Sequence, residues 1–148
     1  MLETIGILRD ISRRCLSNEP LTATQSRWLG ASLTNFLDHR SPSLHEAFGL
    51  RFPKGGVSWW MEEAIRKRNA ALRNLAEHHF DDLPASAQAE RIATLANRYA
   101  TSAWRHDCTR GAMPPHYRGT SKEHLWKAFA SEAAMPLCRR QLSNILAR

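Results

Sequence analysis

The stretch 59–79, WWMEEAIRKRNAALRNLAEHH, decides the fold class of this chain. Acidic Glu62 and Glu63 near its start and His78 and His79 at its end suit the positive and negative ends of a helix dipole. Apolar residues recur in it at helical spacing, as expected for a helix with one buried face: Trp60, Ala64, Ile65, Leu72, Leu75 and Ala76. We therefore predict that this stretch forms the longest helix of the chain.

Helical periodicity continues on both sides of this stretch. The further predicted helices cover 2–17, 22–38, about two turns after Ser43, 82–106, a segment starting at 120 and a last segment starting at 136. No run alternates apolar and polar residues for long enough to predict a strand. The predicted fold class is all-α, a single compact bundle of about six to seven short-to-medium helices, with residues 1–148 as one domain.

Local signals set the expected helix boundaries. A Ser or Thr followed three residues later by Glu or Gln predicts a helix start with a capping box, and the pairs are Thr22–Gln25, Ser43–Glu46 and Thr120–Glu123. Pro136 suits the first position of the last helix, and Gly49 suits a left-handed helix end. Proline and glycine predict loops over 51–57 and 108–119.

Composition excludes several classes of protein. The 148 residues are 43% hydrophobic and 24% charged, which is typical of a folded globular chain. No apolar run approaches the ~18 residues of a membrane span, and charges at Glu3, Arg9 and Asp10 do not fit a secretory signal. The three cysteines are an odd number at wide spacing, so we expect no disulfide framework. A cytoplasmic location is predicted.

Positive charge is concentrated in the last part of the chain. Residues 1–85 hold 11 Lys or Arg and 10 Asp or Glu, whereas residues 86–148 hold 10 and 4. Such a basic half predicts an anionic partner, with nucleic acid, DNA or RNA, the commonest candidate. The residues predicted to bind it are Arg105, Arg110, Arg118, Lys122, Lys127, Arg139, Arg140, Asn144 and Arg148. The interpretation is a non-enzymatic helical module, such as an accessory subunit of a nucleoprotein complex.

The basic end also suggests a helix-turn-helix-like hairpin over 120–148. Its second helix would expose Arg139, Arg140 and Asn144 to phosphates or base edges. The register departs from such units, because Arg140 stands where an apolar residue is expected and the next firmly apolar residue is Leu142. A simple helical hairpin packed on the core is the alternative.

A second motif gives an enzymatic alternative. The sequence Arg73-Asn74-Leu75-Ala76-Glu77-His78 resembles the Arg, polar residue, any three residues, His pattern of the HEPN ribonucleases, which are small all-α bundles. The resemblance implies that Arg73 contacts the scissile phosphate and His78 acts as general acid or base across a dimer. Arg40 to His45 shows the same spacing, and polar residues at the end of a long helix also explain the motif.

The remaining signals are weaker. His106, Cys108, His116 and His124 are zinc-ligand types, but their spacing matches no finger or ribbon, so no metal site and no cofactor are predicted. The loop 108–119 mixes cations and aromatics beside Trp104 and Trp126, which suits single-stranded nucleic acid, although Tyr117 and the prolines could instead pin an ordered loop onto the bundle. A protein-binding adaptor, or an inhibitor of a nucleic-acid enzyme, is the third alternative.

Overall fold

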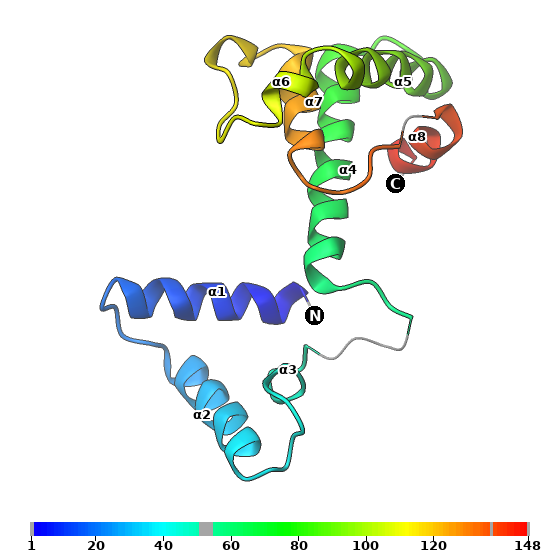
Figure 1. The fold of residues 1–148 in the computed structure, drawn as a ribbon. Helices are drawn as coiled ribbons and strands as arrows, with labels where there is room; N and C mark the ends of the chain where they lie inside the picture. The colour runs from blue at the N-terminus through cyan, green and yellow to red at the C-terminus, as the bar shows by residue number, and fades with distance from the viewer. Residues whose placement is uncertain (1, 51–54, 137, 148) are drawn as a thin grey trace. The chain divides into compact units, whose positions relative to one another are not determined.

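The computed structural model describes residues 2–50, 55–136 and 138–147, and every regular element in these ranges is a helix. The helices are α1 (Leu2–Leu16), α2 (Ala23–Leu37), α3 (Leu44–Ala47), α4 (Trp59–His79), α5 (Ala85–Thr101), α6 (Trp104–Asp107), the 3₁₀ helix η1 (Pro115–Tyr117), α7 (Ser121–Phe129) and α8 (Arg139–Leu146) (Figure 1). The predicted all-α class is therefore confirmed. Contacts within the chain define two compact units, unit 1 (Met1–Trp59) and unit 2 (Trp60–Arg148).

Unit 1 contains α1, α2 and α3, and its predicted helix starts form. Thr22 Oγ1 accepts a hydrogen bond from the Gln25 N–H at 3.1 Å, and Gln25 Oε1 accepts one from the Thr22 N–H at 3.0 Å, so the predicted capping box is complete. Ser43 Oγ accepts from the Glu46 N–H at 3.2 Å, but α3 has one turn rather than two. Gly49 follows it at φ 69°, as predicted for a left-handed end.

The cations at the end of α1 are neutralised within unit 1. Arg13 and Arg14 donate to Asp10 at 2.8 and 2.9 Å, and Arg13 also donates to Glu19 at 2.9 Å. Gln25 donates a third hydrogen bond to Asp10 at 2.6 Å. The hydrogen bonds from Arg14, Arg13 and Gln25 hold the pKa of Asp10 well below its usual range. These arginines are therefore already paired with carboxylates.

The core of unit 2 forms around the C-terminal half of α4, where α5, α6, α7 and α8 gather (Figure 1). The α4 residues buried there are Ala71, Leu72, Leu75 and Ala76, which share one helical face. Other helices complete the core with Ala89, Ile92, Ala96, Tyr99, Tyr117, Leu125, Ala128 and Leu142. The start of α4 contributes little to this core, since Trp60 is 54% exposed.

Two predicted helix boundaries in unit 2 are wrong. The helix predicted over 82–106 is interrupted, because α5 ends at Thr101 and Ser102 leaves helical geometry at φ −120° and ψ −96°. Ser102 Oγ donates to the Arg98 carbonyl at 2.6 Å, an interaction that competes with helix continuation. The last helix starts at Arg139 rather than at Pro136, with Cys138 as its N-cap.

The expected helix-turn-helix-like hairpin is also corrected. Residues 130–138 separate α7 from α8, whereas such a unit uses a turn of three to four residues. α8 packs against α5, and Leu142 is its fully buried anchor. The tertiary contact with α5 thus determines the position of α8.

The loop predicted over 51–57 falls largely outside the described residues, as does Arg148. Cys15, Cys108 and Cys138 are free and exposed.

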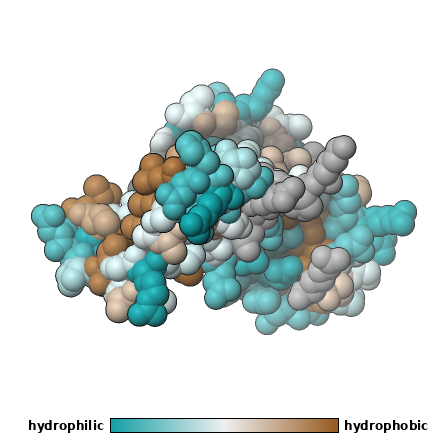
Figure 2. Space-filling view, turned by 90° about the horizontal axis from the view of Figure 1, so that it is seen from below, coloured by the Kyte–Doolittle hydropathy of each residue, from teal (hydrophilic) through white to brown (hydrophobic). Residues whose placement is uncertain are grey.

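Among the described helices, none combines the length and the apolar character needed to cross a bilayer. Figure 2 shows hydrophobic patches between hydrophilic ones on the face that it presents.

Candidate functional site

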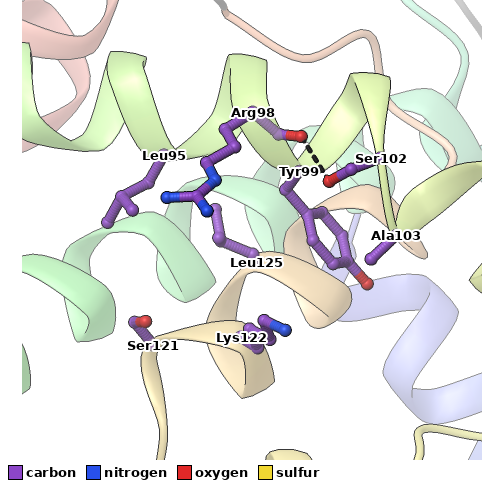
Figure 3. Close-up of a pocket in the computed structure, with 8 residues that line it drawn as sticks. All are labelled: Leu95, Arg98, Tyr99, Ser102, Ala103, Ser121, Lys122 and Leu125. Carbon is purple, nitrogen blue, oxygen red and sulfur yellow. Dashed lines mark hydrogen bonds between the residues drawn. The ribbon is translucent and has the colours of Figure 1, made fainter.

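A cavity of about 330 Å³ lies between the last turns of α5 and the start of α7, and we call it the Arg98 cavity (Figure 3). Its polar lining comes from Arg98 and Ser102 on one side and Ser121 and Lys122 on the other. The Arg98 side chain extends from α5 towards α7 (Figure 3). Apolar and aromatic groups complete the wall, namely Leu95, Tyr99, Ala103 and Leu125.

The start of α7 is built differently from the sequence prediction. Thr120 does not cap the helix, because its Oγ1 donates to the Tyr117 carbonyl at 2.7 Å. Glu123 accepts from the Gly119 N–H at 2.7 Å instead of from Thr120, and Gly119 adopts φ 72°. The predicted Thr120–Glu123 capping box is therefore wrong. Within the described residues, the backbone N–H groups of Ser121 and Lys122 remain without hydrogen-bond partners.

The charge at the Arg98 cavity is positive and not neutralised. Neither Arg98 nor Lys122 has a carboxylate within ion-pair distance in the described part of the chain. Lys122 Nζ instead lies 5.3 Å from the centre of the Tyr117 ring, a cation–π contact that leaves its donors available. Two cations, the Ser121 hydroxyl and the positive end of α7 make this cavity suited to an anion.

A buried polar network lies beside the Arg98 cavity and shares Tyr99 with it. The Tyr99 and Tyr117 hydroxyls both donate to Asp107 Oδ2 at 2.8 Å, and Asp107 is only 4% exposed. Arg110 Nε lies 3.8 Å from Asp107 Oδ1. Burial acts to raise the pKa of Asp107, but the two tyrosine hydrogen bonds, with Arg110 and His116 nearby, outweigh it and lower that pKa. Burial and the carboxylate raise the pKa of Tyr99 and of Tyr117.

The network explains the conformation of the segment between α6 and α7. Tyr117 is 5% exposed and closes η1 onto the core, so the interpretation of 108–119 as an ordered loop pinned by Tyr117 agrees with the structure. Asp107 was not predicted to accept the hydrogen bonds of the two tyrosine hydroxyls. The sequence did contain an indication, because a carboxylate that lies eight and ten residues from two tyrosines is a candidate hydrogen-bond partner for both.

The nine residues predicted to bind nucleic acid do not share one environment. Three cations are ion-paired: Arg110 with Asp107 at 3.8 Å, Lys127 with Glu123 at 2.6 Å and Arg139 with Glu90 at 4.0 Å. Four other cations are exposed and have no ion-pair partner in the described part of the chain: Arg105, Arg118, Lys122 and Arg140. Asn144 lines a separate hollow with Arg68, and Arg148 lies outside the described residues.

The fold brings Lys122 together with Arg98, a residue that was not among the predicted binding residues. Arg98 and Arg91 are seven residues apart on α5, which places them on the same face of the helix. This spacing is the signal that could have identified Arg98. Its proximity to Lys122 depends on the packing of α5 against α7, which local spacing does not encode.

Arg73 and His78, the pair of the ribonuclease-like motif, interact with different parts of unit 2. Arg73 is half-buried, and its Nε donates to the Ile145 carbonyl of α8 at 3.0 Å. His78 Nδ1 lies 2.8 Å from the Asn74 carbonyl one turn earlier in α4. Residues five apart on a helix are separated by about 140°, so the two side chains leave α4 in different directions. Arg73 is positioned to stabilise the C-terminal end of α8.

The three histidines and the one cysteine weighed as zinc ligands form no metal site in the described part of the chain. Throughout residues 2–50, 55–136 and 138–147, no group of three or more His, Cys, Asp or Glu side chains is arranged to hold a metal ion. His116 packs on Tyr117 with ring centres 4.7 Å apart, and His124 faces α4 instead.

His124 belongs to a cluster of three imidazoles at the junction of α4 and α7, in which its ring stacks on His78 and meets His79 edge to face. Its ring centre lies 5.5 Å from that of His78 and 5.4 Å from that of His79. Its Nδ1 is buried without a hydrogen-bond partner in the described structure. Burial lowers the pKa of His124; His79, Lys127 and His78 lower it further, while Glu123 opposes the shift. The neutral imidazole is therefore the form that the fold favours.

Unit 2 is expected to lose stability as the pH falls below about 6.5. The unfolded chain binds a proton at the ordinary histidine pKa, whereas folded His124 binds it only at lower pH, so acid favours unfolding. Thermal unfolding measured between pH 7.5 and 5.5 checks this expectation. His124→Phe keeps an aromatic ring in the cluster and should reduce the loss of Tm between these pH values. An equal loss in the wild type and the variant would contradict the role of His124.

The geometry of unit 2 therefore combines an unneutralised cationic cavity with a rigid aromatic and carboxylate support. In comparisons with known protein families, curated proteins and solved structures, this chain matches none of them.

Proposed function

We propose that this chain is a non-enzymatic nucleic-acid-binding module that contacts backbone phosphates from unit 2. The observation that carries the proposal is the Arg98 cavity, where Arg98 and Lys122 have no carboxylate partner within the described structure. A phosphate diester offers the acceptors that guanidinium, ammonium, hydroxyl and free backbone N–H groups require. The cavity is open to an extended polymer, since Arg98 and Lys122 are themselves exposed.

The distribution of paired and unpaired cations supports this proposal. In unit 1, Arg13, Arg14 and Arg40 lie within 4.0 Å of carboxylates. In the described part of unit 2, seven exposed cations have no such partner, namely Arg66, Arg91, Arg98, Arg105, Arg118, Lys122 and Arg140. Unpaired cations release counterions on binding a polyanion, so the affinity should fall steeply with salt.

The experiment is a fluorescence anisotropy titration of the full chain with labelled single-stranded RNA, single-stranded DNA and duplex DNA at several salt concentrations. The double variant Arg98→Glu, Lys122→Glu should lose about a hundredfold in affinity, because each charge-assisted hydrogen bond contributes ~1.5 kcal/mol or more. The slope of log affinity against log salt should also become shallower by about one for each cation that no longer binds a phosphate.

The matched control is Arg27→Glu with Arg40→Glu, which changes the net charge by the same amount at two exposed arginines of unit 1. This control should retain most of the affinity. If it loses as much as the Arg98, Lys122 variant, the Arg98 cavity is not the binding site. If the wild type binds none of the three nucleic acids at low salt, the proposal is wrong, and a protein partner becomes the explanation of the basic surface.

A further inference from the structure

A further hollow of about 320 Å³ lies between the end of α6 and the end of α7, and we call it the Trp126 hollow. Three aromatic side chains line it, Trp104, Trp126 and Phe129. Arg110 and Glu132 contribute its charged groups, and Cys108, Gly111 and Ala130 complete it. An aromatic lining with one cation and one carboxylate suits a flat heteroaromatic ring that carries hydrogen-bond donors and acceptors.

The aromatic wall is held by the core of unit 2. The ring centres of Trp104 and Phe129 are 5.2 Å apart, and both rings contact buried Tyr99 at 6.1 and 5.3 Å. Tyr99 is in turn fixed by its hydrogen bond to Asp107. These rings are preorganised and lose little conformational freedom when a ligand stacks on them.

Glu132 occupies a conformation that is unfavourable for its residue type. Its φ is 68°, in the left-handed region that glycine adopts most readily. The other non-glycine residues with positive φ in the described chain are Asn18 and His39, whose types tolerate this region better. Strained positions of this kind cluster at ligand sites, where the side chain has a use that glycine lacks. Here the side chain lines the hollow.

We propose that the Trp126 hollow binds a guanine base of single-stranded nucleic acid. The inference rests on the proposed function, to which it adds the base that is recognised. Guanine presents two adjacent donors, N1–H and the N2 amino group, which match the two oxygens of the Glu132 carboxylate. Guanine also presents O6 and N7 as acceptors, the pair that an arginine such as Arg110 contacts most often. The aromatic lining provides the stacking surface.

The same polar groups disfavour the other bases. Uracil and thymine place a carbonyl on each side of their single N–H, so these oxygens would face the Glu132 carboxylate. Adenine and cytosine each offer one amino group next to an acceptor nitrogen, and one carboxylate oxygen would remain unpaired. Leaving a desolvated polar group unpaired is costly, so guanine should be the preferred base.

The test uses 11-nucleotide RNA strands of uracil in which the central base is guanine, adenine or cytosine. An all-uracil strand is the reference. The same set is measured as DNA, with thymine in place of uracil. The wild type should bind the guanine strand about tenfold more tightly than the all-uracil strand. Glu132→Gln should abolish this preference, because the amide no longer offers two acceptor oxygens to guanine and no longer repels the uracil carbonyls. Glu77→Gln, an exposed glutamate on α4, is the matched control and should keep the preference.

A second variant, Glu132→Gly, removes the carboxylate and also relieves the backbone strain, so a loss of binding cannot be attributed to a loss of stability. It should raise the Tm and lose the guanine preference, a combination that a purely structural role of Glu132 does not produce. Equal binding of the guanine and all-uracil strands by the wild type would overturn the guanine site while leaving phosphate binding intact. Absence of binding to every strand would instead overturn the proposed function. Calorimetric titration with GMP and UMP tests whether the hollow also binds a free nucleotide. Tighter binding of GMP than of UMP by the wild type, lost in Glu132→Gln, would support the guanine site.

Discussion

Replacing Asp107 by alanine is expected to destabilise unit 2 by about 3 kcal/mol. The substitution removes two hydrogen bonds to a charged acceptor, each worth ~1.5–3 kcal/mol, and leaves the buried hydroxyls of Tyr99 and Tyr117 without partners. Urea unfolding followed by tryptophan fluorescence, with hydrogen exchange to assign the loss to unit 2, measures the effect. Asp81→Ala, at an exposed carboxylate, is the matched control and should change the stability little.

Variants that each remove one hydrogen bond of the Asp107 network show how much each bond contributes to stability. Tyr99→Phe and Tyr117→Phe each remove one of the two hydrogen bonds and should each cost about half as much as Asp107→Ala. A loss in Asp107→Ala no larger than that in Asp81→Ala would show that the buried carboxylate does not support the fold. Because Tyr99 lines the Arg98 cavity and contacts the aromatic wall of the Trp126 hollow, the Asp107 variant should also weaken both proposed sites.

The same network predicts the response of unit 2 to alkali. Burial and the Asp107 carboxylate raise the pKa of Tyr99 above the usual value of 10.0. The unfolded chain then releases this proton first, so stability is retained below pH 10 and lost as the pH rises above it. Tyr99→Phe should reduce this alkaline loss, measured as the difference in Tm between pH 9 and pH 11.

Replacing Leu142 by alanine should have a comparable effect, about 3 kcal/mol, which corresponds to a fall in Tm of roughly 12–24 °C for a unit of this size. Leu142 is 0% exposed and anchors α8 against α5. α8 runs only from Arg139 to Leu146, and so short a helix depends on packing rather than on its intrinsic propensity. The substitution therefore removes the main interaction that keeps α8 folded.

Hydrogen exchange resolved by segment is the measurement for Leu142→Ala. Residues 139–147 should exchange faster than in the wild type, and the hydrogen bond from Arg73 to the Ile145 carbonyl should break when α8 unfolds. Leu146→Ala is the matched control, because Leu146 is only partly buried and its truncation leaves a smaller cavity. Equal losses of stability in Leu142→Ala and Leu146→Ala would contradict the anchoring role of Leu142.

Most helices could be predicted from local sequence, and the errors share a physical cause. The Thr22–Gln25 box formed because both hydrogen bonds lie within one turn. The Thr120–Glu123 box does not form because the Thr120 hydroxyl donates to the Tyr117 carbonyl instead. Tyr117 is held in place by the hydrogen bond from its hydroxyl to Asp107. Tertiary packing supplied the competing partner, and the local pattern contains no information about it.

The candidate site was predictable only in part. The charge count identified the basic half and Lys122, but Lys127, Arg110 and Arg139 have carboxylate neighbours, one of which, Glu90, lies on another helix. Arg98 escaped selection because its partner in the cavity, Lys122, lies 24 residues later. Pairing and convergence of charges are properties of the folded surface rather than of the sequence order.

The sequence by itself determined the all-α class, the positions of most helices and the excess of positive charge after residue 85, because periodicity, capping and composition act over a few residues or are simple sums. Only the tertiary structure decided which side chains meet. It buried Asp107 between two tyrosines, brought Arg98 to Lys122 and placed Glu132 in a left-handed conformation beside three aromatic rings. These arrangements join separate helices and the segments between them, and burial and proximity follow from how α4, α5 and α7 pack around one core.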